Sequence, residues 1–186
     1  MSAVLLVCDM QAALDERVPA PRGADAKVAQ LLAHWRERGL AVVHLRTDSM
    51  DPAALDAPGR PGHDWLFATR PLDAEIAIEH RTANAFIGSD LMQVLEDTGA
   101  HELVICGATL SGTVESTLRM AHAMGFMVFL PADAVIAHEV ADRAGRRWSA
   151  EEAAALTLGV LDGAFCQVVT VEALVAGGAG GGETVQ

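Results

Sequence analysis

Short apolar runs alternate with helical patterns along the chain. Ala3–Cys8 is an unbroken apolar run, typical of a strand that is covered on both faces. Further strands are predicted over residues 40–45, 74–79, 102–106, 126–130 and 167–171, and helices over 26–38, 89–99, 112–124 and 149–161. Ser89 is the expected cap of its helix, and Ser149-Ala-Glu-Glu152 has the form of a capping box. Strands separated by helices indicate parallel β-α-β units. We therefore expect an α/β fold, a doubly wound six-stranded parallel sheet with helices on both faces.

Two segments fall outside this alternation. Residues 46–73 form an irregular stretch of 28 residues with four of the seven prolines, and so long a connection in a compact domain is usually a lid or a binding loop. Residues 177–186 are a Gly-rich tail of low complexity, which predicts disorder. The sequence therefore predicts one domain over residues 1–176, followed by the tail.

The charge balance restricts the partners of the protein. Thirteen basic against 25 acidic side chains give a net charge of −12, which repels nucleic-acid phosphates and anionic lipid. Met1–Val7 has no basic residue and Asp9 ends its apolar stretch, so we expect no signal peptide and a cytoplasmic location. The three cysteines each lie in an apolar run, which predicts buried, reduced thiols. We expect a small-molecule ligand, with no nucleic-acid or membrane partner.

The carboxyl ends of the predicted strands carry the candidate chemistry, because doubly wound sheets bind ligands there. Asp9-Met10-Gln11 follows the first strand, His80-Arg81 the third, residues 108–113 the fourth and Asp133 the fifth. We expect these side chains to meet at one edge of the sheet. Asp9 stands out, because a carboxylate directly after a fully apolar strand loses solvation unless a nearby group pairs with it or a ligand uses it. A carboxylate that only caps the next turn is an equally weighted alternative.

Several common uses of this fold are excluded. The first strand-to-helix turn has no glycine, so the dinucleotide fingerprint is absent, and neither a phosphate-binding P-loop nor a G-x-S-x-G elbow occurs. A second acid beside Asp9, which an aspartyl-phosphate enzyme needs for magnesium, is also missing. We therefore expect no cofactor.

Four segments resemble one known family. Asp9-Met10-Gln11 resembles the D-M-Q opening of the isochorismatase-like, or cysteine hydrolase, superfamily. Residues 84–91 are similar to its S-A-F-x-G-T-x-L segment, residues 107–117 to its G-V-x-T-x-x-C-V-x-x-T segment, and Asp133-Ala134 to the D-A after its fifth strand. The resemblance covers about residues 3–174 and implies the same α/β fold. It also implies a cis peptide bond at Ala108–Thr109.

The chain departs from this family at two catalytic positions. Amide-hydrolysing members use an aspartate, a lysine and a cysteine, which fall here on Asp9, His80 and Thr113. A hydroxyl that ionises like water has a pKa near ~15.7, which is about 7 units above the pKa of a thiol, near ~8.5. At ~1.36 kcal/mol per unit the difference is on the order of 10 kcal/mol, and a helix terminus supplies only ~0.3–2 kcal/mol. Thr113 is therefore a poor replacement for a thiolate.

Two hypotheses of different classes follow. The isochorismatase branch of the family, which cleaves a vinyl ether, also lacks the cysteine and uses the aspartate as general acid, but it retains the lysine. The first hypothesis is accordingly a hydrolase of a small organic molecule without a cysteine nucleophile, and vinyl-ether cleavage is its nearest family chemistry. Its catalytic residues are Asp9, His80 and Thr113, the latter two positioning the substrate, with Gln11, Ala108, Thr109 and Gly112 as substrate-binding residues.

The second hypothesis is a catalytically silent relative that serves as a small-molecule-binding or scaffolding subunit. A third, disfavoured by the ionisation of a hydroxyl, is an amidase with a threonine nucleophile. His80 and Thr113 each also have an equally weighted structural interpretation, as a strand-end histidine and a helix-terminal hydroxyl.

Two further expectations concern metals and assembly. Zinc-containing members carry an Asp-x-His…His pattern, but Asp48, His63 and Asp64 lack its tight spacing, so we expect no metal. Apolar residues make up 51% of the chain and the mean hydropathy is +0.26, with Met120 and Met124 near one edge beside Phe126. Because a soluble protein hides large apolar patches, we expect a homo-oligomer.

Overall fold

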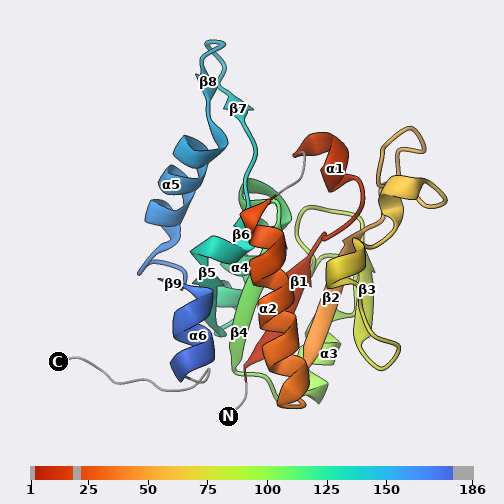
Figure 1. The fold of residues 1–186 in the computed structure, drawn as a ribbon, viewed down its shortest axis with the longest axis vertical. Helices are drawn as coiled ribbons and strands as arrows, with labels where there is room; N and C mark the ends of the chain where they lie inside the picture. The colour runs from red at the N-terminus through yellow and green to blue at the C-terminus, as the bar shows by residue number, and fades with distance from the viewer. Residues whose placement is uncertain (1–2, 19–21, 178–186) are drawn as a thin grey trace.

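A computed structural model describes residues 3–18 and 22–177, and its central element is a parallel sheet (Figure 1). The strands are β1 (Val4–Cys8), β2 (Val42–Thr47), β3 (Ile76–His80), β4 (Glu102–Ala108), β5 (Met127–Pro131) and β9 (Gln167–Val169). Their order is β3-β2-β1-β4-β5-β9, and every neighbouring pair is parallel. The predicted α/β fold class is confirmed, since all six expected strands are present and in one sheet.

Helices cover both faces of the sheet and create two hydrophobic cores. One face packs against α2 (Gly23–Glu37) and α6 (Val171–Gly177), and the other against α3 (Leu91–Asp97), α4 (Glu115–Ala123) and α5 (Ala150–Leu161). Within β1, Leu5 and Val7 belong to the first core, whereas Leu6 and Cys8 belong to the second. This division follows from the alternation of side chains along a strand, and it explains why β1 is apolar throughout.

Some elements differ from the sequence prediction. The first residues of the helix expected over residues 112–124 belong instead to an irregular π-helical turn, η3 (Leu110–Val114), so that α4 begins only at Glu115. α2 begins at Gly23, three residues earlier than expected, and the last strand ends at Val169 because α6 begins at Val171. The short elements α1 (Leu14–Arg17), β6 (Val135–Ile136, paired with β4), β7 (Val140–Ala141), β8 (Arg147–Trp148) and η4 (Ala132–Ala134) were not predicted. Each is too short to show a hydrophobic period.

Two helix starts test the capping predictions. Ser149 and Glu152 form the expected reciprocal capping box at the start of α5. At α3 the N-cap residue is Asp90, although the Ser89 hydroxyl accepts a hydrogen bond from the Leu91 N–H. The capping box is confirmed, and the cap expected at Ser89 lies one residue further along.

The long connection between β2 and β3 packs along the segment that follows β1. It contains the 3-10 turns η1 (Pro61–His63) and η2 (Phe67–Thr69). Ala12 N–H donates to Asp64 O at 2.8 Å, Ala13 N–H to Gly62 O at 2.9 Å, and Leu66 N–H to Met10 O at 2.9 Å. These backbone bonds hold the connection over the carboxyl end of β1, where the candidate site lies.

The remaining expectations concern the tail, membranes and the apolar edge. The predicted tail lies outside the described residues except for Gly177, the last residue of α6. No helix within residues 3–18 and 22–177 has both the length and the apolar character needed to cross a membrane. Met124 is 45% exposed, whereas Met120 and Phe126 pack against the core beneath α4.

Candidate active site

Asp9 takes up an unusual backbone conformation at the end of β1. Its φ is +45°, and it is the only non-glycine residue with a positive φ in the described part of the chain. On the adjacent strand, Gly107 has φ +106°, and a Cβ there would lie 2.2 Å from Cys8 O. An L-residue in the left-handed region is held there by its surroundings, and such residues gather at functional sites.

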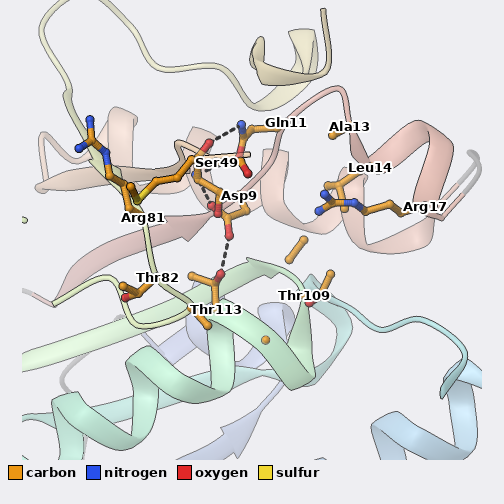
Figure 2. A pocket seen from close by; sticks show the side chains of 15 residues that line it. Asp9, Gln11, Ala13, Leu14, Arg17, Ser49, Arg81, Thr82, Thr109 and Thr113 are labelled. Carbon is orange, nitrogen blue, oxygen red and sulfur yellow. Dashed lines mark hydrogen bonds between the residues drawn. The ribbon is translucent and has the colours of Figure 1, made fainter. Parts of the chain in front are cut away.

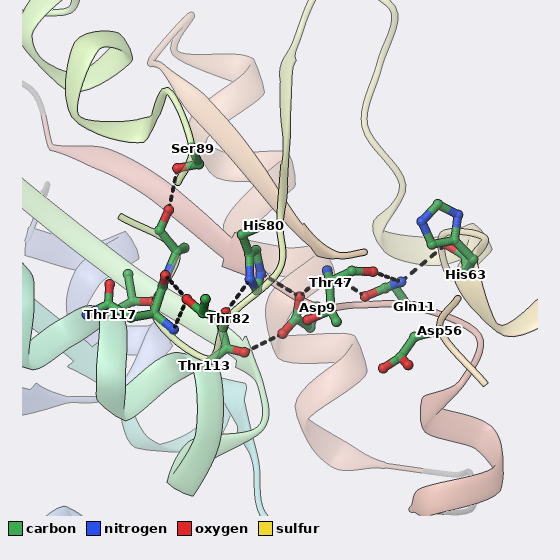
Figure 3. A network of polar contacts seen from close by, with 12 residues as sticks. Asp9, Gln11, Thr47, Asp56, His63, His80, Thr82, Ser89, Thr113 and Thr117 are labelled. Atoms are coloured by element: carbon green, nitrogen blue, oxygen red, sulfur yellow. Dashed lines mark hydrogen bonds and ion pairs between the residues drawn. The ribbon is translucent and has the colours of Figure 1, made fainter. Parts of the chain in front are cut away.

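The two carboxylate oxygens of Asp9 have different surroundings (Figure 3). Oδ1 accepts the Thr47 N–H at 2.8 Å and lies 3.0 Å from His80 Nε2. Oδ2 accepts the Thr113 hydroxyl at 2.5 Å. The side chain is 14% exposed. One oxygen is therefore held by two N–H groups, while the other faces a hydroxyl.

The hydrogen bonds of His80 fix its charge. Nδ1 lies 2.8 Å from Thr82 O and Nε2 lies 3.0 Å from the Asp9 carboxylate, and both partners are acceptors. Both ring nitrogens must then carry a proton, which makes the ring an imidazolium. Burial lowers the pKa of His80, but the hydrogen bond and the charge of Asp9, together with the Thr82 carbonyl, outweigh it and raise that pKa. Asp9 and His80 form an ion pair.

A pocket of about 280 Å³ opens above this pair (Figure 2). It is lined by six of the seven site residues expected from the sequence, namely Asp9, Gln11, Ala108, Thr109, Gly112 and Thr113. The seventh, His80, is 1% exposed and lies behind Asp9. Contrary to the expectation that His80 positions the substrate directly, its side chain reaches a ligand only through Asp9.

The wall beside Thr113 is formed by the turn after β4. The peptide bond Ala108–Thr109 is cis, as the family resemblance implies. Gly112 leaves room for the Thr109 hydroxyl, because a Cβ at position 112 would lie 2.6 Å from Thr109 Oγ1. The turn therefore brings two hydroxyls, from Thr109 and Thr113, to the same wall of the pocket.

Gln11 lines the pocket but uses its amide within the protein. Its Oε1 accepts the Thr47 N–H at 3.0 Å, and its Nε2 donates to Thr47 O at 3.0 Å and to His63 O at 3.3 Å. Gln11 thereby ties the end of β2 to the long connection. Its role as a substrate contact stays a prediction, and the structure adds the support of Thr47.

Eight lining residues were not singled out from the sequence: Ala13, Leu14, Arg17, Thr47, Ser49, Met50, Thr82 and Ala83. Thr47 ends β2, so the rule that ligands bind at the carboxyl ends of strands could have found it. Ser49 and Met50 lie in the long connection that was expected to be a lid or a binding loop. Arg17 carries no such signal, because it lies on a four-residue helix.

The other candidate groups serve the fold. Asp133 accepts the Val171 N–H at 2.9 Å and pairs with Lys27 at 3.1 Å, so it anchors α6 and α2. Asp48 pairs with Arg81 at 3.1 Å and lies 3.5 Å from His63 Nε2. In residues 3–18 and 22–177 no three His, Cys, Asp or Glu side chains gather as a metal site would require.

The three cysteines are buried and unpaired, as predicted. Burial raises the pKa of Cys8 and of Cys106, and it raises that of Cys166 to about 11 with a contribution from Asp162. None of them lines the pocket. The site therefore contains no thiolate.

The fold and the site define a doubly wound α/β protein with an aspartate at the carboxyl edge of a parallel sheet, beside a pocket for a small molecule. The family model of the isochorismatase domain matches residues 3–171, so the chain belongs to the isochorismatase family of hydrolases.

Several known proteins are similar to this chain. A protein from Chromobacterium violaceum, described as a hydrolase of the isochorismatase family, has a structure with a TM-score of 0.90 and 39% identity, covering 94% of this chain and 92% of that one. An isochorismatase family protein of Bacillus subtilis, YrdC, is 28% identical over 92% of this chain and 93% of its own length. A streptothricin hydrolase of Streptomyces noursei is 34% identical over 73% of this chain and 55% of its own length.

Proposed function

We propose that this protein hydrolyses a small organic molecule, with Asp9 as general acid–base and without a cysteine nucleophile. The observation that carries the proposal is the division of the Asp9 carboxylate. Oδ1 is occupied by the Thr47 N–H and by His80, while Oδ2 lies against the hydroxyl of Thr113 at the pocket. Only Oδ2 is in a position to exchange a proton with a ligand.

His80 supports this role from behind. Its imidazolium fixes the direction of the carboxylate, because His80 Nε2 lies 3.0 Å from Asp9 Oδ1. The Thr113 hydroxyl holds Oδ2 in the resting site and can hold a water molecule beside it during the reaction. Asp9 then moves a proton between that water and the substrate.

The scissile bond is one that needs proton transfer and water but no thiolate. A vinyl ether meets this requirement, since it needs a proton on carbon followed by water. The similar streptothricin hydrolase adds streptothricin to the substrates to be tested.

A second candidate mechanism has a specific observation in its favour. Thr113 Oγ1 lies 2.5 Å from Asp9 Oδ2, which is hydrogen-bond reach between a hydroxyl nucleophile and its base. In that mechanism Asp9 removes the hydroxyl proton as Oγ1 attacks, so the hydroxyl need not ionise beforehand. The bond from the acyl carbon to the leaving amine or alcohol breaks, and the leaving group takes the proton from Asp9. Water then hydrolyses the ester on Thr113 and releases the acid.

The test is a hydrolysis screen of vinyl ethers, amides, esters and streptothricin with wild type, Asp9→Asn and Thr113→Ala. We expect Asp9→Asn to lose ~10²–10⁴-fold in rate, since the amide keeps the shape but cannot exchange the proton. Thr113→Ala should lose roughly 10-fold, the effect of one neutral hydrogen bond. Asp133→Asn is the matched control, because it removes a carboxylate from the same sheet edge outside the pocket and keeps an oxygen for the Val171 N–H.

The outcomes separate the mechanisms. Equal rates for wild type and Asp9→Asn on every substrate would refute the proposal and leave a small-molecule-binding subunit. A Thr113→Ala loss as large as that of Asp9→Asn, with a trapped ester in the intact mass of wild type, would establish the threonine nucleophile instead.

A further inference from the structure

Arg17 brings a guanidinium to a pocket whose floor is Asp9. It is the last residue of the short helix α1 and lines the pocket. Figure 2 shows its side chain reaching from α1 towards the middle of the pocket. Arg81 also lines the pocket, but in the same view its guanidinium points away from Asp9 on the opposite side. Arg17 is thus the cation that faces the space above Asp9.

Arg17 is held in place by a buried carboxylate. Its Nη2 donates to Asp56 Oδ2 at 2.7 Å, and the Asp56 side chain is only 8% exposed. Asp56 lies on the long connection between β2 and β3, so the pair joins α1 to that connection. The guanidinium therefore has a defined direction, although the Arg17 side chain is 47% exposed.

The rest of the guanidinium is open to a ligand. Arg17 has five N–H donors, and within the described residues only Nη2 makes a hydrogen bond, the one to Asp56. Asp56 uses one of the two Nη2 hydrogens, so the other Nη2 hydrogen still shares an edge of the guanidinium with Nε or with Nη1. A guanidinium edge matches the two oxygens of a carboxylate, which it binds through parallel N–H bonds.

We propose that Arg17 forms a carboxylate subsite, so that the substrate is a small monocarboxylic acid bound between Arg17 and Asp9. The carboxylate binds Arg17, and the bond to be hydrolysed lies at Asp9 and Thr113. This assignment names the substrate class of the proposed hydrolase, and it rests on that proposal for the position of the scissile bond.

The charges and the size of the pocket select a small monoanion. Asp56 balances Arg17, and His80 balances Asp9, so a dianion such as phosphate would be repelled by two nearby carboxylates without a second free cation. The pocket volume of about 280 Å³ equals that of about nine water molecules at ~30 Å³ each. A molecule of that size has room for one carboxylate and one hydrolysable group.

The test compares two probes of the same shape, succinamate and its neutral analogue succinamide, by calorimetric titration. We expect wild type to bind succinamate about 10- to 100-fold more tightly, the range for hydrogen bonds to a charged group. Arg17→Met should reduce this preference to about 1-fold. Arg119→Met is the matched control, because it removes an arginine from an ion pair on α4, outside the pocket, and should keep the preference.

Further variants keep the test decisive if Arg17→Met leaves Asp56 unpaired and unfolds the protein. The double variant Arg17→Met/Asp56→Asn removes both charges and should also lose the preference, whereas Asp56→Asn alone should keep it. Equal binding of the two probes by wild type, no binding of either, or a preference that survives loss of Arg17 would each overturn the subsite.

Binding is measured independently of turnover, which separates the two proposals. Arg17-dependent selection of succinamate by a protein that hydrolyses nothing would overturn the proposed function and leave the subsite standing. Asp9-dependent hydrolysis with no preference for carboxylates would overturn the subsite alone.

Discussion

The ion pair between Asp9 and His80 should be the strongest single coupling at the candidate site. His80 is buried completely, and Asp9 is exposed only towards the pocket. His80→Leu leaves that carboxylate without its cation and with two donors, the Thr47 N–H and the Thr113 hydroxyl. Removing one partner of a buried ion pair costs ~3–5 kcal/mol. Because Asp9 keeps two bonds and some contact with water, we expect a loss of ~3 kcal/mol.

A double-mutant cycle isolates the pair from the loss of packing. Urea unfolding of wild type, Asp9→Asn, His80→Leu and the double variant should give a coupling energy of ~2–3 kcal/mol. The control cycle uses Glu115 and Arg119, an ion pair of 2.8 Å on the surface of α4. Such a helical surface pair contributes ~0.3–0.5 kcal/mol.

The coupling energy between Asp9 and His80 should also depend on pH in a defined direction. The pKa of His80 is raised above its ordinary value of 6.5, since the bond and charge of Asp9 outweigh the opposing effect of burial. A group with a raised pKa in the folded state contributes its full stability below its unfolded value and loses it as pH rises through the folded value. The coupling should thus shrink as pH rises above about 6.5 and passes through the folded value. A coupling no larger than that of the surface pair, or one that grows as pH rises above about 6.5, would refute the ion pair.

Four other predictions concern the rest of the molecule. Burial raises the pKa of Glu75, but Arg36 and neighbouring donors outweigh burial and lower that pKa from 4.5 to about 2. At ~1.36 kcal/mol per pKa unit, the ionised carboxylate contributes up to ~3 kcal/mol to the free energy of unfolding. This contribution is lost as pH falls from 4.5 through 2. In urea unfolding across that range Glu75→Gln should flatten the loss, and an unchanged profile would contradict the network. Iodoacetamide should leave the activity of the folded protein intact, because all three cysteines are buried, and inactivation that parallels alkylation in the intact mass would contradict this. Gly112→Ala should displace the Thr109 hydroxyl and reduce kcat/KM, while the unfolding free energy changes by only ~1 kcal/mol. Unchanged kinetics would show that the Thr109 hydroxyl has no role in the reaction. Sedimentation velocity at micromolar concentration should show a homo-oligomer, and a monomer would exclude it.

The position of the candidate site was predictable because it depends on local patterns. The apolar run of β1 identifies a strand that is covered on both faces, and Asp9 follows it directly. The same reasoning applies to His80 after β3 and to the segment after β4. Carboxyl ends of parallel strands share an edge, so these residues could be expected in one place before any contact was known.

The roles of these residues were decided by tertiary structure. Asp9 meets His80 across 71 positions and Thr113 across 104, so their contacts depend on strand order, on register and on the left-handed backbone at Asp9. Hydrophobic periodicity contains none of this information, because it reports only which face of an element is buried. It could not show that His80 lies behind the carboxylate rather than beside the ligand.

Arg17 is a pocket residue that the sequence pattern could not identify. No apolar period marks α1, which has four residues, and an arginine in a polar stretch of sequence resembles any solvated surface residue. Its place in the pocket comes from a buried carboxylate 39 positions away, on a connection without regular structure. The sequence by itself determined the sheet and the edge at which its polar residues gather, because short-range patterns encode burial. Only the folded chain decided which side chains face the ligand, since that depends on contacts between segments whose spacing in the sequence carries no period.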